Sequence, residues 1–260
     1  MPLKRGHTLV EALCALSLGT VLAAACGLAL GAARAALERA EARDIGGRAE
    51  REAVAIVRRA LATGAAAIAR GDTAVELDLL LGVSVACAVG PRELLLPSPQ
   101  GSALTALPTA PTTDDLVAIR GWATPHADWQ YALVDSAGPR ADPSRCTQAD
   151  GWRAAAEAHT PLLRVVLTDS LPADLEEAAE VRLYRRGRFV LYHAGRGDWM
   201  LGWRRCHPWT AACGPLQPVA GPLRAAGAHG FRVWWADLPA RWELRALGVG
   251  GRGASATVPQ

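Results

Sequence analysis

The stretch HTLVEALCALSLGTVLAAACGLALGAA, residues 7–33, decides how this chain is organised. No charged residue occurs from Ala12 to Ala33, a run of 22 positions. Because a helix needs about 20 apolar residues to cross the hydrocarbon core of a bilayer, this run predicts a membrane-spanning helix. Glu11 stands at its start, and Lys4 and Arg5 precede it. An acid at the entrance to a membrane span is costly and by default marks a functional contact.

This order of residues resembles the type IV prepilin signal of pilins and type II secretion pseudopilins, carried here by Gly6, Thr8, Leu9, Glu11 and Leu13. The resemblance implies that a prepilin peptidase cuts after Gly6. His7 would then be the first mature residue and the candidate for N-methylation, although most members of the family begin with phenylalanine or another bulky apolar residue.

Glu11 would be the fifth residue of the mature chain. The resemblance implies that its carboxylate is an assembly contact, paired with the N-terminal amine of a neighbouring subunit. Such pairing is physically reasonable, because each charge in an apolar layer needs a partner of opposite sign.

Two other signals compete with this interpretation. A secretory signal has an apolar core of about 7 to 15 residues and a small-residue cleavage site, and the segment 23–26 (AAAC) is similar to a degraded lipobox. The apolar run here is longer than a secretory core and begins with a glutamate, and Leu22 lies one position too far from Cys26 for a lipobox. The prepilin interpretation keeps the apolar segment on the mature protein as an anchor.

Proline marks the expected domain boundary. After Pro2 the next proline is Pro91, and proline inside a helix costs about 3 kcal/mol, so a long helix is expected early and none late. The expected organisation is a leader at 1–6, a membrane and assembly helix at 7–33, an amphipathic continuation at 34–62, and a head domain at 63–260. Within the membrane part, small residues recur at helical spacing, which favours close helix contacts; they are Gly19, Ala23, Gly27 and Gly31.

The head is expected to be an antiparallel β-sheet, which makes the fold class α+β with a pilin-like long N-terminal helix. Short runs of β-forming residues are separated by turn residues, at 75–79, 83–85, 116–122, 162–168, 180–184, 188–192, 199–205, 231–236 and 242–249. The Arg185-Arg186-Gly187 segment predicts the turn of a hairpin. The glycine-rich run 248–253 is expected to be a flexible terminus, because no helix follows that could seat a phosphate.

The order of motifs in the head looks like that of PilW-type minor pilins, and the J-type pseudopilins share the broad architecture. The motifs are Asp114-Asp115-Leu116-Val117, Leu183-Tyr184 to Leu191-Tyr192, Arg204-Arg205-Cys206, Pro218-Val219-Ala220 and Gly230-Phe231-Arg232-Val233.

Four cysteines lie beyond the anchor, and an even set in an exported domain predicts two disulfides. The expected pairs are Cys206 with Cys213 and Cys87 with Cys146.

No catalytic or cofactor motif is apparent. The head histidines are scattered, and Cys206-His207 with Cys213 lacks the close spacing of zinc ligands. Asp114-Asp115 is a weak alternative for a calcium site. We therefore expect no enzyme activity, no metal and no cofactor. The net charge is only +3, without a basic stripe, so nucleic acid is not an expected partner.

The expected function is that of a minor pilin in the assembly or initiation of a type IV pilus. The alternatives are a J-type pseudopilin of a type II secretion system and, from another class, a membrane-tethered periplasmic binding protein. The expected partners are the prepilin peptidase, the other minor pilins with the major pilin, and the assembly platform of the inner membrane. The protein is expected to span the inner membrane once with its head in the periplasm, and to reach the pilus after assembly.

Overall fold

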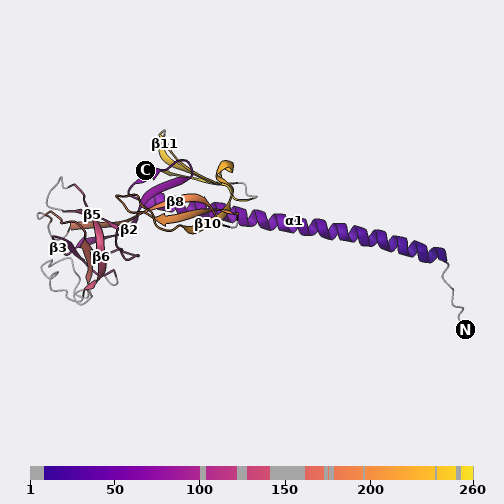
Figure 1. Ribbon diagram of the computed structural model, residues 1–260, viewed down its shortest axis with the longest axis horizontal. Helices are drawn as coiled ribbons and strands as arrows, with labels where there is room; N and C mark the ends of the chain where they lie inside the picture. The colour runs from indigo at the N-terminus through magenta and orange to yellow at the C-terminus, as the bar shows by residue number, and fades with distance from the viewer. Residues whose placement is uncertain are drawn as a thin grey trace.

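A computed structural model describes residues 9–99, 104–121, 128–140, 162–172, 175, 179–195, 197–237, 239–249 and 253–259, without the side chains of 9–15 and 140. Helix α1 spans Leu9–Thr63, which at 1.5 Å per residue is about 80 Å. It projects from a β-rich head, so that the start of α1 lies far from the head (Figure 1). The long N-terminal helix expected from the sequence is confirmed.

The end of α1 is set by Gly64. The Gly64 amide donates to the carbonyl of Ala60 (2.9 Å), and the next amide, that of Ala65, donates to the carbonyl of Asp78 (3.1 Å). A Cβ on Gly64 would lie 3.0 Å and 3.2 Å from those two carbonyl oxygens. Glycine therefore lets the chain leave the helix and join the sheet within one residue.

The head is built from antiparallel strands. The described residues form β1 (Ala67–Ala69), β2 (Ala74–Ala86), β3 (Ala88–Gly90), β4 (Glu93–Leu96), β5 (Leu116–Arg120), β6 (Gln130–Arg140), β7 (Leu162–Leu167), β8 (Ala179–His193), β9 (Trp199–Arg205), β10 (Gln217–Leu223), β11 (Phe231–Asp237), β12 (Ala240–Ala246) and β13 (Ala254–Pro259), with a 3-10 turn at Ala226–Ala228. Every strand pair is antiparallel, as expected. The α+β class is confirmed at this level.

Two long strands run through the whole head. The large sheet has the order β1-β2-β8-β5-β6-β7-β4-β3, with β9 and β10 attached beside β8, and β11-β12-β13 form a second sheet. β2 and β8 pair from Ala74 opposite Val190 to Ala86 opposite Ala179. The two strands therefore form a common spine for both ends of the head.

The helix-side end of the head, here called the proximal lobe, encloses the last part of α1. The apolar face of α1 packs between the large sheet and the three-stranded sheet, which buries residues from all three layers. Its largest buried members include Leu77, Phe231, Leu223, Leu201 and Leu244. The amphipathic half of the helix thus supplies the core of the proximal lobe, because its apolar stripe repeats with the helical period.

The far end, here called the distal lobe, has its own core. Buried residues of β2, β4, β5, β6, β7 and β8 meet there, and include Leu94, Val117, Ile119, Val134, Val165 and Leu183. Val181 and Leu183 of β8 belong to this core, whereas Phe189 and Leu191 belong to the proximal core. Residues 184–187 of β8 therefore mark the waist between the lobes.

The predicted hairpin at residues 180–192 is wrong. These residues form the single strand β8, and Gly187 lies opposite Leu77 inside the ladder. A Cβ on Gly187 would lie 1.6 Å from Cη2 of Trp203. Gly187 is therefore needed for the indole of Trp203 on the neighbouring strand to approach, and not for a turn.

The prediction of a flexible glycine-rich terminus is also wrong for the described residues there. Glu50 of α1, with 3% of its surface exposed, accepts hydrogen bonds from the amides of Gly248 (2.6 Å) and Gly253 (3.0 Å). A Cβ on Gly46 would lie 2.3 Å from the carbonyl oxygen of Val249. The glycines let the C-terminal loop lie directly on α1, and β13 follows as a further strand.

Other strand boundaries differ in ways that pairing explains. The two strands expected at 75–79 and 83–85 are one strand, β2, with a register shift between Leu80 and Gly82. β10, which contains Pro218 and Pro222, was not among the expected strands. It pairs with β9 at the edge of the large sheet, and its other side has one isolated bridge, from Leu223 to Gly248. An edge strand tolerates proline because most of one side of its backbone needs no partner.

Candidate functional site

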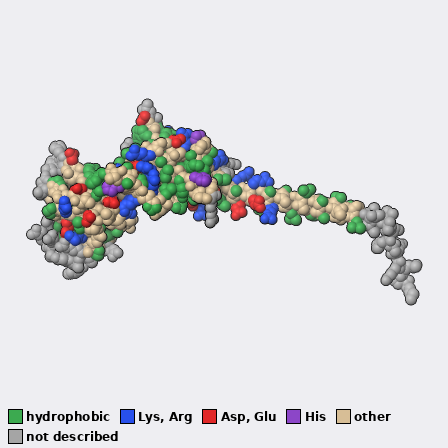
Figure 2. All heavy atoms as spheres, in the orientation of Figure 1, with side chains coloured by type: hydrophobic (Ala, Val, Ile, Leu, Met, Phe, Trp, Pro, Cys, Tyr) green, Lys and Arg blue, Asp and Glu red, His purple; other side chains and the backbone are tan. Residues whose placement is uncertain are grey.

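The part of α1 outside the head is covered by exposed apolar side chains. Leu28 is 77% exposed, and the other large apolar residues from Leu16 to Leu37 are exposed as well. On the part of the projecting helix whose side chains are described, Figure 2 shows Lys, Arg, Asp and Glu side chains only close to the head. Each exposed leucine forgoes about 1.5 to 3 kcal/mol of burial, and α1 is long and apolar enough to cross a membrane. The helix is therefore compatible with a single-pass membrane anchor.

The residues that resemble a prepilin signal lie at the edge of what the structure describes. Gly6 and His7 lie outside the described residues, and Glu11 is the third residue of α1, without a described side chain. Gly19, Gly27 and Gly31 lie in the projecting helix, and a Cβ on any of them would meet nothing within 4 Å. The small-residue face is thus open in the single chain.

The cysteine pairs are partly visible. Cys206 and Cys213 form a disulfide with a Cα separation of 4.0 Å. Cys87 is disulfide-bonded, and Cys146, its expected partner, lies outside the described residues. Cys26 is a free, exposed cysteine of the anchor.

Asp115, one half of the weak calcium candidate, is instead the centre of an ion cluster at the waist. Its side chain has no exposed surface. It accepts hydrogen bonds from Arg185 (2.9 Å and 2.7 Å), from Arg205 (3.0 Å) and from the amide of Thr112 (2.8 Å). The hydrogen bond to Asp115 raises the pKa of Arg185. With two guanidinium groups on one carboxylate, no charge is left for a cation.

The other face of the waist carries two more buried acids. Asp78 forms a bidentate pair with Arg186 (2.7 Å and 2.8 Å). Glu76 binds Arg188 (2.6 Å) and Arg70 (3.3 Å). Burial alone would raise the pKa of Glu76, but the hydrogen bonds from both arginines outweigh it and the pKa lies below its ordinary value. Arg185 and Arg186, which predicted a turn, are therefore the partners of two buried acids, Asp115 and Asp78, on opposite faces of the waist.

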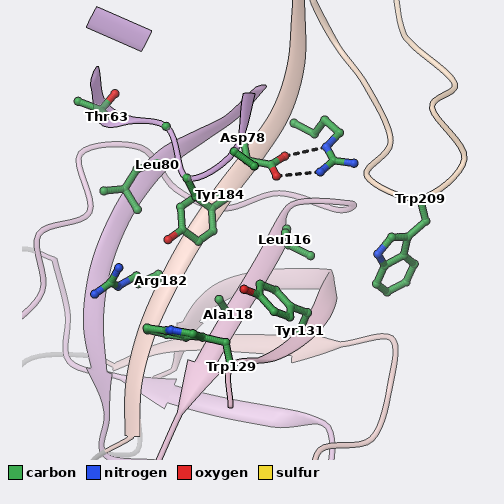
Figure 3. Close-up of a pocket in the computed structure, with 14 residues that line it drawn as sticks. Thr63, Asp78, Leu80, Leu116, Ala118, Trp129, Tyr131, Arg182, Tyr184 and Trp209 are labelled. Carbon is green, nitrogen blue, oxygen red and sulfur yellow. Dashed lines mark hydrogen bonds and ion pairs between the residues drawn. The ribbon is translucent and has the colours of Figure 1, made fainter. Parts of the chain in front are cut away.

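Above these pairs lies a pocket of about 640 Å³ on the outer face of the sheet (Figure 3). Its floor is made by Leu116, Ala118 and Tyr184, and Leu80 closes one side. Trp129 and Tyr131 lie at one end of the pocket, and the Asp78–Arg186 pair lies at the opposite end. Trp209 lies at the side of the pocket between these two ends. Tyr131 and Trp209 are each 57% exposed. The rings therefore present open surface around an apolar floor.

Trp209 is held at the rim by the loop that the Cys206–Cys213 disulfide closes. The amides of Trp209 and Thr210 each donate to Nδ1 of His207 (3.2 Å). Arg186 donates to the carbonyl of Pro208 while it also holds Asp78. One guanidinium group thus connects the floor of the pocket with its rim.

The charged groups at the ring end are paired as well. Arg182 and Arg120 each place their guanidinium carbon 4.7 Å from the ring centre of Trp129, and both bind Glu180 (2.6 Å and 2.7 Å). Burial raises the pKa of Tyr184, against the hydrogen bond from Arg182. The Tyr184 hydroxyl therefore keeps its proton at neutral pH.

The sequence did not reveal this pocket. Its rings come from the start of β6, the middle of β8 and the loop after β9, and neither spacing nor composition brings these together. In the part of the chain that the structure describes, no three His, Cys, Asp or Glu residues lie close enough to hold a metal ion.

A scan against protein-family models finds no match, and searches of the curated proteins and of the solved structures find no significant similarity. What the chain does must therefore be inferred from its own sequence and geometry.

Proposed function

We propose that this protein is a minor-pilin-like structural subunit that takes part in the assembly or initiation of a type IV pilus. The observation that supports the proposal is the exposed part of α1, in which the charge-free run from Ala12 to Ala33 follows residues that resemble a prepilin signal, and which continues without a break into the core of a β-sheet head. A helix that serves both as anchor and as scaffold can move out of the lipid and pack among like helices while it still carries its head.

The head gives independent support for export. The Cys206–Cys213 disulfide and the disulfide-bonded Cys87 suit an oxidising compartment. With the anchor in the inner membrane, the head would lie in the periplasm before assembly.

Glu11 is the residue that we propose to direct assembly. Cleavage after Gly6 would free the amine of His7, and the Glu11 carboxylate of a neighbouring subunit would neutralise it within the apolar layer. An unpaired buried charge costs about 3 to 5 kcal/mol, so the subunits would be held in one register along the bundle.

The first test is the N-terminus of the membrane-extracted protein. Mass spectrometry should find His7 as the first residue, and Gly6→Val should retain the leader because the added side chain crowds the peptidase site. A mature start at Cys26, or an intact Met1, would contradict the proposal.

The second test separates an assembly subunit from a simple anchor. Glu11→Ala should be processed and remain in the membrane, yet be missing from sheared filaments. Glu41→Ala, which removes an acid of the same helix outside the apolar run, should be incorporated normally. Equal incorporation of wild type and Glu11→Ala would rule out the pairing.

The pocket at the waist favours a second candidate, a membrane-tethered binding protein. This candidate predicts that the protein stays in the membrane fraction and that its loss leaves filaments intact. Loss of surface pili on deletion supports the pilin, whereas loss of secreted proteins with intact pili supports a J-type pseudopilin.

A further inference from the structure

The pocket on the outer face of the waist has the size and lining of a small-molecule site. Its volume of about 640 Å³ lies within the range of about 300 to 1,000 Å³ that is usual for such sites. Its walls come from the α1–β1 connection, from β2, β5, β6 and β8, and from the disulfide-closed loop. The assembly mechanism proposed above makes no use of it.

The charges in the pocket indicate a neutral ligand. Asp78 is paired with Arg186, and Arg182 is paired with Glu180. A cationic ligand would have to displace Arg186 from the buried Asp78, which costs several kcal/mol, and an anionic ligand would have to compete with Glu180 for Arg182. A neutral ligand leaves both pairs in place.

The polar groups argue against a purely apolar ligand. Tyr184 and the Asp78–Arg186 pair border the same space as the rings (Figure 3). An apolar occupant would remove water from these groups and return no hydrogen bond, which is unfavourable. A carboxylate already bound to one guanidinium group still has lone pairs to accept hydroxyl protons.

A peptide would also find fewer main-chain hydrogen-bond partners in this pocket than at the edge of a sheet. The pocket lies on the face formed by β2, β8, β5 and β6, which are interior strands in the order β1-β2-β8-β5-β6-β7. The face of a sheet presents side chains, and not the free main-chain ladder that strand addition requires.

We propose that this pocket binds a neutral carbohydrate, whose C–H faces stack on Tyr131 and Trp209 and whose hydroxyl groups bond Tyr184 and Asp78. A sugar ring has both an apolar face and fixed hydroxyl groups, so it satisfies the rings and the polar end together. The Cys206–Cys213 disulfide has the role of holding Trp209 at the rim. This binding does not depend on processing at Gly6 or on incorporation into a filament, so it stands or falls separately from the proposed function.

The test uses the full chain in detergent, titrated with neutral trisaccharides of glucose, galactose and N-acetylglucosamine. Isothermal titration calorimetry and tryptophan fluorescence report binding. At least one trisaccharide should bind, and Tyr131→Ala and Trp209→Ala should each weaken it about tenfold, which corresponds to about 1.4 kcal/mol. Trp234→Ala removes a partly exposed indole of β11, away from the pocket, and should bind like wild type.

Circular dichroism and the melting temperature should show that both pocket variants fold like wild type, since the two rings are largely exposed. Failure of all the trisaccharides to bind, or equal binding by wild type and the two pocket variants, overturns the proposal. Tighter binding of a proline-rich peptide or an acidic trisaccharide, lost in the same variants, would also overturn it and assign the pocket to that class.

Discussion

Replacement of Glu50 by alanine is expected to release the C-terminal end of the chain from α1. The Glu50 carboxylate is buried and accepts the amides of Gly248 and Gly253. A hydrogen bond to a charged group contributes about 1.5 to 3 kcal/mol, so losing both should lower the free energy of unfolding by about 3 to 6 kcal/mol. The free energy of unfolding of a domain is only about 5 to 15 kcal/mol, so Glu50→Ala should remove a large fraction of the stability of the head.

The assay is urea unfolding of the detergent-solubilised chain, followed by tryptophan fluorescence. Glu50→Gln keeps one acceptor oxygen and turns an amide donor towards the other N–H, so its loss should be intermediate. Glu52→Ala is the matched control, because Glu52 is 48% exposed and pairs only with the exposed Arg48; it should lose about 0.5 kcal/mol or less. Equal losses for Glu50→Ala and Glu52→Ala would refute the role of the carboxylate.

Three further outcomes are expected. Gly187→Ala should destabilise the head by about 1 to 3 kcal/mol or more, because the added methyl group overpacks against Trp203. Gly138→Ala is the control and should be nearly neutral, because a Cβ there has nothing within 4 Å. Equal melting temperatures for the two variants would contradict this reasoning. The pKa of Glu76 is lowered in the folded head from 4.5, so its ion pairs should stabilise the protein above about pH 4.5. This stabilisation should fade as the pH falls through the lower folded pKa. When the free energy of unfolding is measured as the pH is lowered, Glu76→Gln should therefore lose less stability than wild type. Non-reducing peptide mapping should recover the Cys206–Cys213 peptide, and free thiols at both positions in protein from the periplasmic face would contradict an oxidised head.

The long N-terminal helix could be predicted from sequence because the signal is local. A charge-free run of 22 residues and the absence of proline from 3 to 90 leave few alternatives to a long helix. The antiparallel sheet was predictable for a similar reason, since β-forming runs alternate with turn residues.

The course of β8 could not be predicted, because the reason for it lies elsewhere in the chain. Arg185, Arg186 and Gly187 have the composition of a turn. Their partners are Asp115, Asp78 and Trp203 on three neighbouring strands. Tertiary pairing overrides the local preference.

The glycine-rich run near the C-terminus was misjudged for the same reason. Its contact with Glu50 joins Gly248 to a residue 198 positions earlier. Glycine there lets two backbones approach closely. In a single sequence, a glycine needed for close packing looks the same as a glycine in a flexible segment. The pocket was missed because its rings are distant in the chain.

The paired spine of β2 and β8 has a mechanical consequence. Because both strands extend from the proximal core to the distal core, a pull that separates the lobes is carried by two covalent backbones. The hydrogen bonds from Ala74 opposite Val190 to Ala86 opposite Ala179 hold these backbones side by side, so neither strand bends at the waist alone. The two lobes should therefore keep their spacing when the head is fixed through its helix and pulled at its far end.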